Sequence, residues 1–214
     1  QAALNLTVAT DSVYMGYQAG GLGVITGTHN VAIGKNAMYE ATSANTSVFI
    51  GTDAGGQTTA SHSRSAPITG ASNVVVGYAA GFDLTSGASN VLIGREAGFN
   101  FTDNASNIAI GYGALDAATG NENNNIAIGT NALGAENSDA DGGVAIGHQA
   151  LLYQNRDNSR NLAIGYAALG TLGNGVTYGG IRNTVIGYNA GSSGVFGGGS
   201  DGGSNEYGSN NTLV

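Results

Sequence analysis

The chain has 214 residues with a formal net charge of −8 at pH 7, and it contains 38 glycines, one proline and no cysteine or tryptophan. The lack of cysteine excludes disulfides, cysteine-ligated zinc and thiol nucleophiles, and six scattered Lys and Arg residues provide no basic stripe for nucleic acid. No apolar run approaches the ~20 residues of a transmembrane helix, so we expect no membrane insertion in this segment.

Ten copies of a short motif, approximately Asn-Val-x-Ile-Gly-x-x-Ala, follow one another along the chain. Their glycines, called the repeat glycines, are Gly16, Gly34, Gly51, Gly77, Gly94, Gly111, Gly129, Gly147, Gly165 and Gly187. Most are 17 or 18 residues apart, with longer intervals after Gly51 and Gly165. Such a period indicates a repeat architecture. Both ends match internal parts of the motif, so we expect residues 1–214 to be one repeat domain cut from a longer fibre.

Each copy predicts the same local structure. The β-branched or aliphatic residues before the glycine, as in 31–33 and 108–110, favour a short strand. Asn or Ser four residues before the glycine favours a turn and, when stacked, a side-chain ladder between coils. The alanine three residues after the glycine is predicted to begin a second strand. Together these elements predict an all-β fold, a parallel β-roll or β-solenoid of about eleven coils that lie ~4.8 Å apart.

Strand alternation sets which residues face outward. We predict that residues one and three before the glycine face the core and that the residue two before it faces outward. The outward position would then be apolar along the whole rod, which is too extensive for a lone soluble chain. It predicts a side-by-side homotrimer, with a seam made by the larger residues at this position: Tyr14, Phe49, Val75, Leu92 and Val185.

Repeats such as Asn30-Val31-Ala32-Ile33-Gly34 and Asn125-Ile126-Ala127-Ile128-Gly129 resemble the head repeats of YadA-like trimeric autotransporter adhesins. The copies Gly16-Tyr17-Gln18-Ala19-Gly20 and Gly187-Tyr188-Asn189-Ala190-Gly191 are similar to repeats of phage tail fibres. The resemblance implies a left-handed β-roll, a trimer, and attachment to a host surface glycan or receptor. It places the chain outside the cell, in a virion tail fibre first and on a bacterial surface as the alternative. The period here is longer than the ~14 residues usual for such head repeats.

Length variation predicts the binding loops, because repeat cores set spacing while loops carry function. We assign insertions to residues 56–72, 171–182 and 192–210. Aromatic and Arg side chains in loops are favoured binding anchors, and the candidate receptor contacts are His62, Arg64, Tyr178, Arg182, Phe196 and Tyr207. The alternative is that these segments are solvated connections. A series of tyrosines directly after the repeat glycines either stacks sugar rings or packs at a turn or subunit seam.

Enzymatic signals are poor. No histidine motif for a metal or nucleophile motif is present, so we predict no enzyme, no metal and no cofactor. A fibre depolymerase remains an alternative function, because glycan cleavage uses paired carboxylates and Asp139 and Asp141 could supply them. An ice-binding solenoid is the last alternative, and it needs a regular array of Thr that the sequence does not show.

Overall fold

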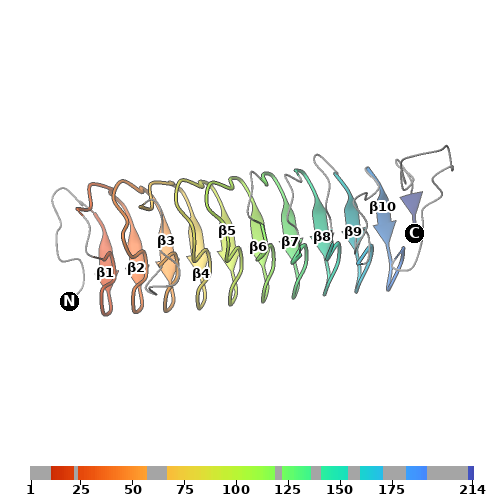
Figure 1. The fold of residues 1–214 in the computed structure, drawn as a ribbon, viewed down its shortest axis with the longest axis horizontal. Helices are drawn as coiled ribbons and strands as arrows, with labels where there is room; N and C mark the ends of the chain where they lie inside the picture. The colour runs from red at the N-terminus through yellow and green to blue at the C-terminus, as the bar shows by residue number, and fades with distance from the viewer. Residues whose placement is uncertain are drawn as a thin grey trace.

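A computed structural model describes residues 11–21, 24–56, 67–118, 122–135, 141–153, 160–170, 182–191 and 212–214. These residues contain one parallel sheet of eleven strands, arranged in chain order along the long axis (Figure 1). The strands are β1 (Val13–Met15), β2 (Val31–Ile33), β3 (Val48–Ile50), β4 (Val74–Val76), β5 (Val91–Ile93), β6 (Ile108–Ile110), β7 (Ile126–Ile128), β8 (Val144–Ile146), β9 (Leu162–Ile164), β10 (Thr184–Ile186) and β11 (Thr212–Leu213).

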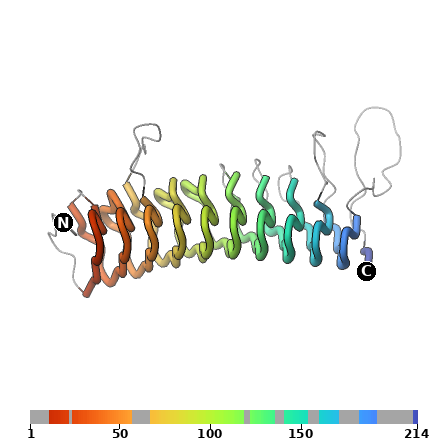
Figure 2. Tube along the Cα trace, turned by 90° about the horizontal axis from the view of Figure 1, so that it is seen from below, coloured from red at the N-terminus to blue at the C-terminus, as the bar shows by residue number. Residues whose placement is uncertain are grey.

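The chain winds into a rod with the coil of β1 near one tip and β11 at the other (Figure 2). Each strand pairs in register with the equivalent strand of the next coil, as Val31 pairs with Val48 and Val48 with Val74. The rest of each coil serves as the crossover that parallel neighbours require. The predicted all-β class, parallel pairing and β-solenoid architecture are therefore confirmed.

The prediction of a second strand in each coil is wrong. The residues after each repeat glycine form turns, and the positions two and four residues after it have positive φ in every copy, as in Asn36 (54°), Met38 (56°), Asn131 (52°) and Leu133 (49°). This left-handed conformation is incompatible with a strand. Hydrogen bonds still join these turns from coil to coil, as Asn36 N donates to Tyr17 O at 2.8 Å.

The predicted orientation of the strands is also wrong, because the middle residue of each three-residue strand, β1 to β10, points inward. Ala32, Phe49, Val75, Leu92 and Val185 have no exposed surface in the single chain, and Tyr14 packs against the same core. The predicted seam residues thus line the interior of one rod and form no outer stripe. The interior is too narrow for two columns of Val and Ile, so the first and third residues of each strand face outward.

A ladder of buried polar side chains runs beside the sheet, as expected. At eight of the ten positions four residues before a repeat glycine, the side-chain oxygen accepts a hydrogen bond from the backbone N–H of the equivalent residue in the next coil. Gly143 has no side chain and interrupts the ladder. The bond from Asn107 N to Asn90 Oδ1 is 3.0 Å long, and Ser47 Oγ performs the same function for Asn73 N at 3.1 Å. Asn90 Nδ2 meanwhile donates to Asn104 O at 2.7 Å. The ladder satisfies backbone groups that burial would otherwise leave without partners.

Two kinds of coil fill the interior beside the strand with one large side chain each. Where the middle strand residue is large, the residue four after the repeat glycine is Gly, and where it is Ala, that residue is Leu or Met. A Cβ on Gly55 would lie 2.3 Å from the Phe49 ring, and one on Gly98 would lie 2.9 Å from Leu92. The ten pairs are Tyr14/Gly20, Ala32/Met38, Phe49/Gly55, Val75/Gly81, Leu92/Gly98, Ala109/Leu115, Ala127/Leu133, Ala145/Leu151, Ala163/Leu169 and Val185/Gly191.

This complementarity predicts that one coil can be converted into the other kind. Ala109→Leu alone should overpack the interior and cost about 1–3 kcal/mol, and Leu115→Gly alone should leave a cavity and cost about 2–5 kcal/mol. The double variant should lose no more than about 1 kcal/mol, since Leu92 and Gly98 already form such a coil next to it. Denaturant unfolding of the four proteins measures the coupling. A double variant whose loss equals the sum of the two single losses would contradict the exchange.

Candidate functional site

The outward-facing first and third residues of β1–β10 form one continuous surface, here called the aliphatic face. It includes Met15, which is 60% exposed, and Ile93 and Ile128, which are 37% and 36% exposed. Only Thr184 among its members is polar. They are Val13, Met15, Val31, Ile33, Val48, Ile50, Val74, Val76, Val91, Ile93, Ile108, Ile110, Ile126, Ile128, Val144, Ile146, Leu162, Ile164, Thr184 and Ile186.

One edge of the aliphatic face is bordered by the residues that directly follow the repeat glycines, here called the post-glycine column. Nine of them are exposed and Thr130 is partly buried. The column is rich in aromatic and cationic side chains and contains no acid. Its members are Tyr17, Lys35, Thr52, Tyr78, Arg95, Tyr112, Thr130, His148, Tyr166 and Tyr188.

Two groups in this column stack along the rod. The Arg95 guanidinium lies between the rings of Tyr78 and Tyr112, 5.5 and 5.6 Å from their centroids. His148 stacks on Tyr166 at 4.9 Å, and Tyr166 stacks on Tyr188 at 5.1 Å. Neighbours therefore cover the ring faces inside each stack. This geometry does not favour the stacking of sugar rings on these tyrosines, because that contact needs a free ring face.

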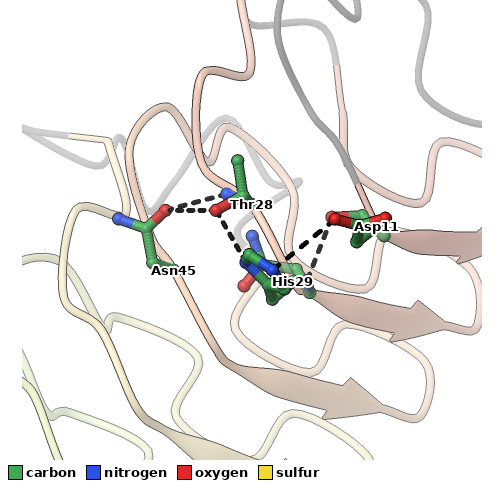
Figure 3. Close-up of polar contacts among 6 residues, drawn as sticks. Asp11, Thr28, His29 and Asn45 are labelled. Atoms are coloured by element: carbon green, nitrogen blue, oxygen red, sulfur yellow. Dashed lines mark hydrogen bonds and ion pairs between the residues drawn. The ribbon is translucent and has the colours of Figure 1, made fainter.

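The other edge is bordered by the residues five before the repeat glycines, here called the pre-strand column. All ten have φ between 45° and 71° and nine are exposed. In the first coils His29 Nε2 lies 3.6 Å from Asp11 Oδ2, and its Nδ1 lies 2.9 Å from Thr28 Oγ1 (Figure 3). The column consists of Asp11, His29, Thr46, Ser72, Ser89, Ser106, Asn124, Gly142, Arg160 and Arg182.

Asp116 is a partly buried carboxylate with a perturbed environment. Burial raises its pKa to about 6, and the nearby negative charge of Glu96 acts in the same direction. Its Oδ1 atom is buried and accepts no hydrogen bond. Glu96 itself pairs with Arg95, whose Nη2 lies 3.0 Å from Glu96 Oε1. The charged form of Asp116 is thus disfavoured in the folded chain.

Most of the predicted receptor contacts, namely His62, Arg64, Tyr178, Phe196 and Tyr207, lie outside the described residues. Arg182 is described, is exposed, and belongs to the pre-strand column. The last part of the predicted first insertion belongs to the regular stack, because Ile68 is buried and pairs with Ala41 of the preceding coil.

The carboxylates considered for catalysis do not form a described site. Asp139 lies outside the described residues, and Asp141 Oδ1 accepts a hydrogen bond from Asn123 N at 2.6 Å, which is a structural role. Nowhere in the described ranges do three His, Cys, Asp or Glu side chains gather in a way that could hold a metal ion. The described residues also include no helix with the length and hydropathy needed to cross a membrane.

Threonines are more regular in the structure than in the sequence. Backbone hydrogen bonds align Thr26 with Thr42, and Thr69 with Thr85 and Thr102. The hydroxyls of Thr26 and Thr85 donate to carbonyls of the next coil at 3.1 and 3.0 Å. A single column with hydroxyls engaged in this way is not the flat array that ice binding requires.

Strand alternation alone does not identify the aliphatic face as the outer surface. The sequence signal that identifies it is a correlation in size: a large middle strand residue occurs with Gly four residues after the repeat glycine, and Ala occurs with Leu or Met there. Such compensation is expected only of residues that pack in the same interior. Comparison with known proteins adds no relative: no family model, curated protein or solved structure matches the chain.

The raised pKa of Asp116 predicts that its carboxylate destabilises the fold at neutral pH. The stabilising contribution of its proton is complete below the ordinary pKa of 3.8 and is lost as pH rises through about 6. Asp116→Asn should therefore increase stability at pH 7.5, on the order of 1 kcal/mol after allowance for its partial exposure, and have little effect at pH 4. Thermal unfolding at both pH values tests this, with the exposed Asp103→Asn as control. An equal effect of Asp116→Asn at the two pH values would contradict it.

Proposed function

We propose that this chain is a structural and adhesive fibre module, a homotrimer that belongs to a phage tail fibre and attaches it to a host cell surface. The head of a bacterial YadA-like adhesin is the alternative setting, and both are extracellular. The observation that carries the proposal is the aliphatic face, because it extends over ten of the eleven strands without a charged residue. The proposal includes no catalytic activity and no cofactor.

The size of the aliphatic face supports association with further copies. Ten strands at ~4.8 Å spacing make it about 45 Å long. With roughly 15 Å of width, it covers on the order of 700 Å², close to the ~800 Å² that each partner contributes to a standard interface. Monomeric soluble proteins rarely expose an apolar patch of this size.

The narrowness of the face supports a threefold arrangement. A three-residue strand presents only two outward columns, about 7 Å apart. Three such faces that meet around one axis bury both columns of every copy and bring the flanking polar columns of neighbouring copies together. Closed rotational symmetry of this kind is the usual arrangement of soluble homo-oligomers.

A rigid trimer also suits attachment. Long-range backbone pairing stiffens the rod, and three copies present every surface residue three times at fixed spacing. Multivalent engagement raises the apparent affinity by about 10²–10⁴ even when each contact with a surface glycan or receptor is weak. The acidic, weakly charged composition is compatible with neutral glycans as partners.

Sedimentation equilibrium tests the assembly directly. The native mass should be three times the 21.1 kDa of one chain, and Ile128→Asp in the middle of the aliphatic face should yield monomers, because a charge buried in the interface is strongly unfavourable. Ser86→Asp changes an exposed residue outside the face and its two borders, and it should leave the trimer intact. A monomeric wild-type chain would refute the proposed assembly, and a mass of two chains would replace the threefold arrangement.

Binding to cells tests the adhesive part. Fluorescently labelled protein should bind a subset of intact bacterial strains from a diverse panel, and removal of surface glycans should reduce that binding. The Ile128→Asp variant should bind at least about 100-fold more weakly, since it loses multivalency, while Ser86→Asp should match the wild type. Equal binding by monomer and trimer would contradict the role given to multivalency.

A further inference from the structure

The last two members of the pre-strand column are neighbouring arginines, here called the arginine pair. Arg160 and Arg182 lie two residues before Leu162 and Thr184, which are register partners in β9 and β10. Equivalent positions of adjacent parallel strands are about 4.8 Å apart. Both side chains therefore start from the same edge of the sheet, one coil apart, and both residues are exposed.

No acidic side chain accounts for the arginine pair. The sequence has 14 acidic residues, but residues 158–200 contain none of them. Asp141 of the preceding coil accepts a hydrogen bond from Asn123 N and forms no ion pair with Arg160. Within the described residues neither arginine has an ion pair, a side-chain hydrogen bond or a ring contact. Two positive charges one coil apart repel each other, so the pair supplies no ionic attraction within the described part of the chain.

The pre-strand column itself does not require arginine. All its members have a left-handed backbone conformation, with φ of 45° at Arg160 and 56° at Arg182, and serine adopts it equally in other coils, as Ser89 does at 61°. The Cγ of Arg160 lies 3.4 Å from the position that a Cβ of Gly142 would occupy, so the arginine side chain extends along the column beside that glycine. The missing side chain of Gly142 leaves the surface next to Arg160 low.

We propose that the arginine pair binds a tetrahedral oxyanion, a phosphate or sulfate ester carried by a glycan of the host surface. The inference rests on the attachment in the proposed function and names the chemical group that is recognised. A guanidinium is a planar fork of N–H groups that donates two parallel hydrogen bonds to an oxyanion. A tetrahedral ester has oxygens for both forks, whereas a carboxylate presents its two oxygens to one. The bound anion also relieves the repulsion between the two arginines.

The charge of the rest of the chain favours an isolated anionic group over a continuous polyanion. Before residue 158 acidic residues outnumber basic ones, so a nucleic acid or an anionic membrane laid along the rod would be repelled there. A single ester on an otherwise neutral glycan meets only the arginine pair. The pre-strand column borders the aliphatic face, so the proposed trimer places the pair at the rim of the interface, where polar groups stay in contact with water.

Titration of the full chain, followed by NMR, tests the site. The side-chain Nε–Hε signals of Arg160 and Arg182 should shift when glucose 1-phosphate or glucose 6-sulfate is added. The signal of Arg95 should not, since its guanidinium already contacts Glu96 and two tyrosine rings. Glucose should cause no shift, and glucuronic acid should bind at least about fivefold more weakly than the two esters. Equal binding of glucuronic acid would overturn the tetrahedral group, and inorganic phosphate that binds about tenfold more tightly than glucose 1-phosphate would overturn the glycan as its carrier.

Substitutions that other coils already contain provide matched variants. Arg160→Ser/Arg182→Ser should weaken the binding of glucose 1-phosphate at least about tenfold. Arg160→Lys/Arg182→Lys keeps the charges but loses the planar forks, so its affinity should fall between those of the serine variant and the wild type. Lys35→Thr/Arg95→Thr removes two positive charges from the post-glycine column, which has threonine in two coils, and it should change the affinity less than about twofold. Equal losses in the double serine and double threonine variants would overturn the inference.

Binding to cells separates the inference from the proposed function. On bacterial strains that the wild type binds, Arg160→Ser/Arg182→Ser should bind at least about tenfold more weakly, with the circular dichroism and sedimentation of the wild type. Full retention of cell binding by this variant would overturn the arginine pair as the glycan contact and leave the attachment function in place. A wild-type chain that binds glucose 1-phosphate through the pair but binds no bacterial strain would refute the attachment function and support the oxyanion site.

Discussion

The close contact between repeat glycines of successive coils is the constraint on which the rest of the structure depends. Their φ values lie between 124° and 141°, and a Cβ on any of the first nine would lie 2.3–2.6 Å from the main chain of the next repeat glycine. Only glycine permits both the conformation and the approach. The backbone N–H of a repeat glycine also donates a hydrogen bond to the last strand residue of the preceding coil, as Gly34 N donates to Met15 O at 2.8 Å. The strands therefore lie in register because the glycines stack.

Tight stacking leaves a thin interior, and the thin interior determines which residues face outward. Beside each strand the interior has room for one sizeable side chain, supplied either by the strand or by the turn after the glycine, as Phe49 and Leu115 illustrate. Some coils bury a second large side chain farther along, such as Leu84 or Phe101. The Val and Ile residues that flank the middle strand residue have no place inside. The rod therefore buries alanines and asparagines while the Val and Ile residues at the ends of its strands lie at the surface, against the usual distribution. An apolar surface that needs a partner follows directly from the geometry of the coil.

The repeat period, the parallel pairing and the polar ladder could be predicted from the sequence, because each depends on residue types at fixed spacing. The orientation of the strands could not be predicted from alternation alone, which allows either Ala109 or its neighbours Ile108 and Ile110 to face inward. The assumption that the larger residues face inward gave the wrong orientation, because it ignores the width of the interior. The prediction of a second strand was wrong for a local reason. Met38 and Leu133 adopt the left-handed backbone conformation, which their residue types do not indicate.

The coil-to-coil variation of the bordering columns has a physical use in the proposed trimer. The aliphatic face is nearly identical in every coil, so a slip of one coil between copies keeps Ile and Val in contact with Ile and Val. Pairing in β-structures is weakly specified when the surfaces are this uniform. The bordering columns are not uniform, as the change from Gly142 to Arg160 and Arg182 illustrates, so a slip of one coil changes which side chains face each other across the interface. The face thus supplies the area of the interface, and the columns at its edges select one register by penalising the others.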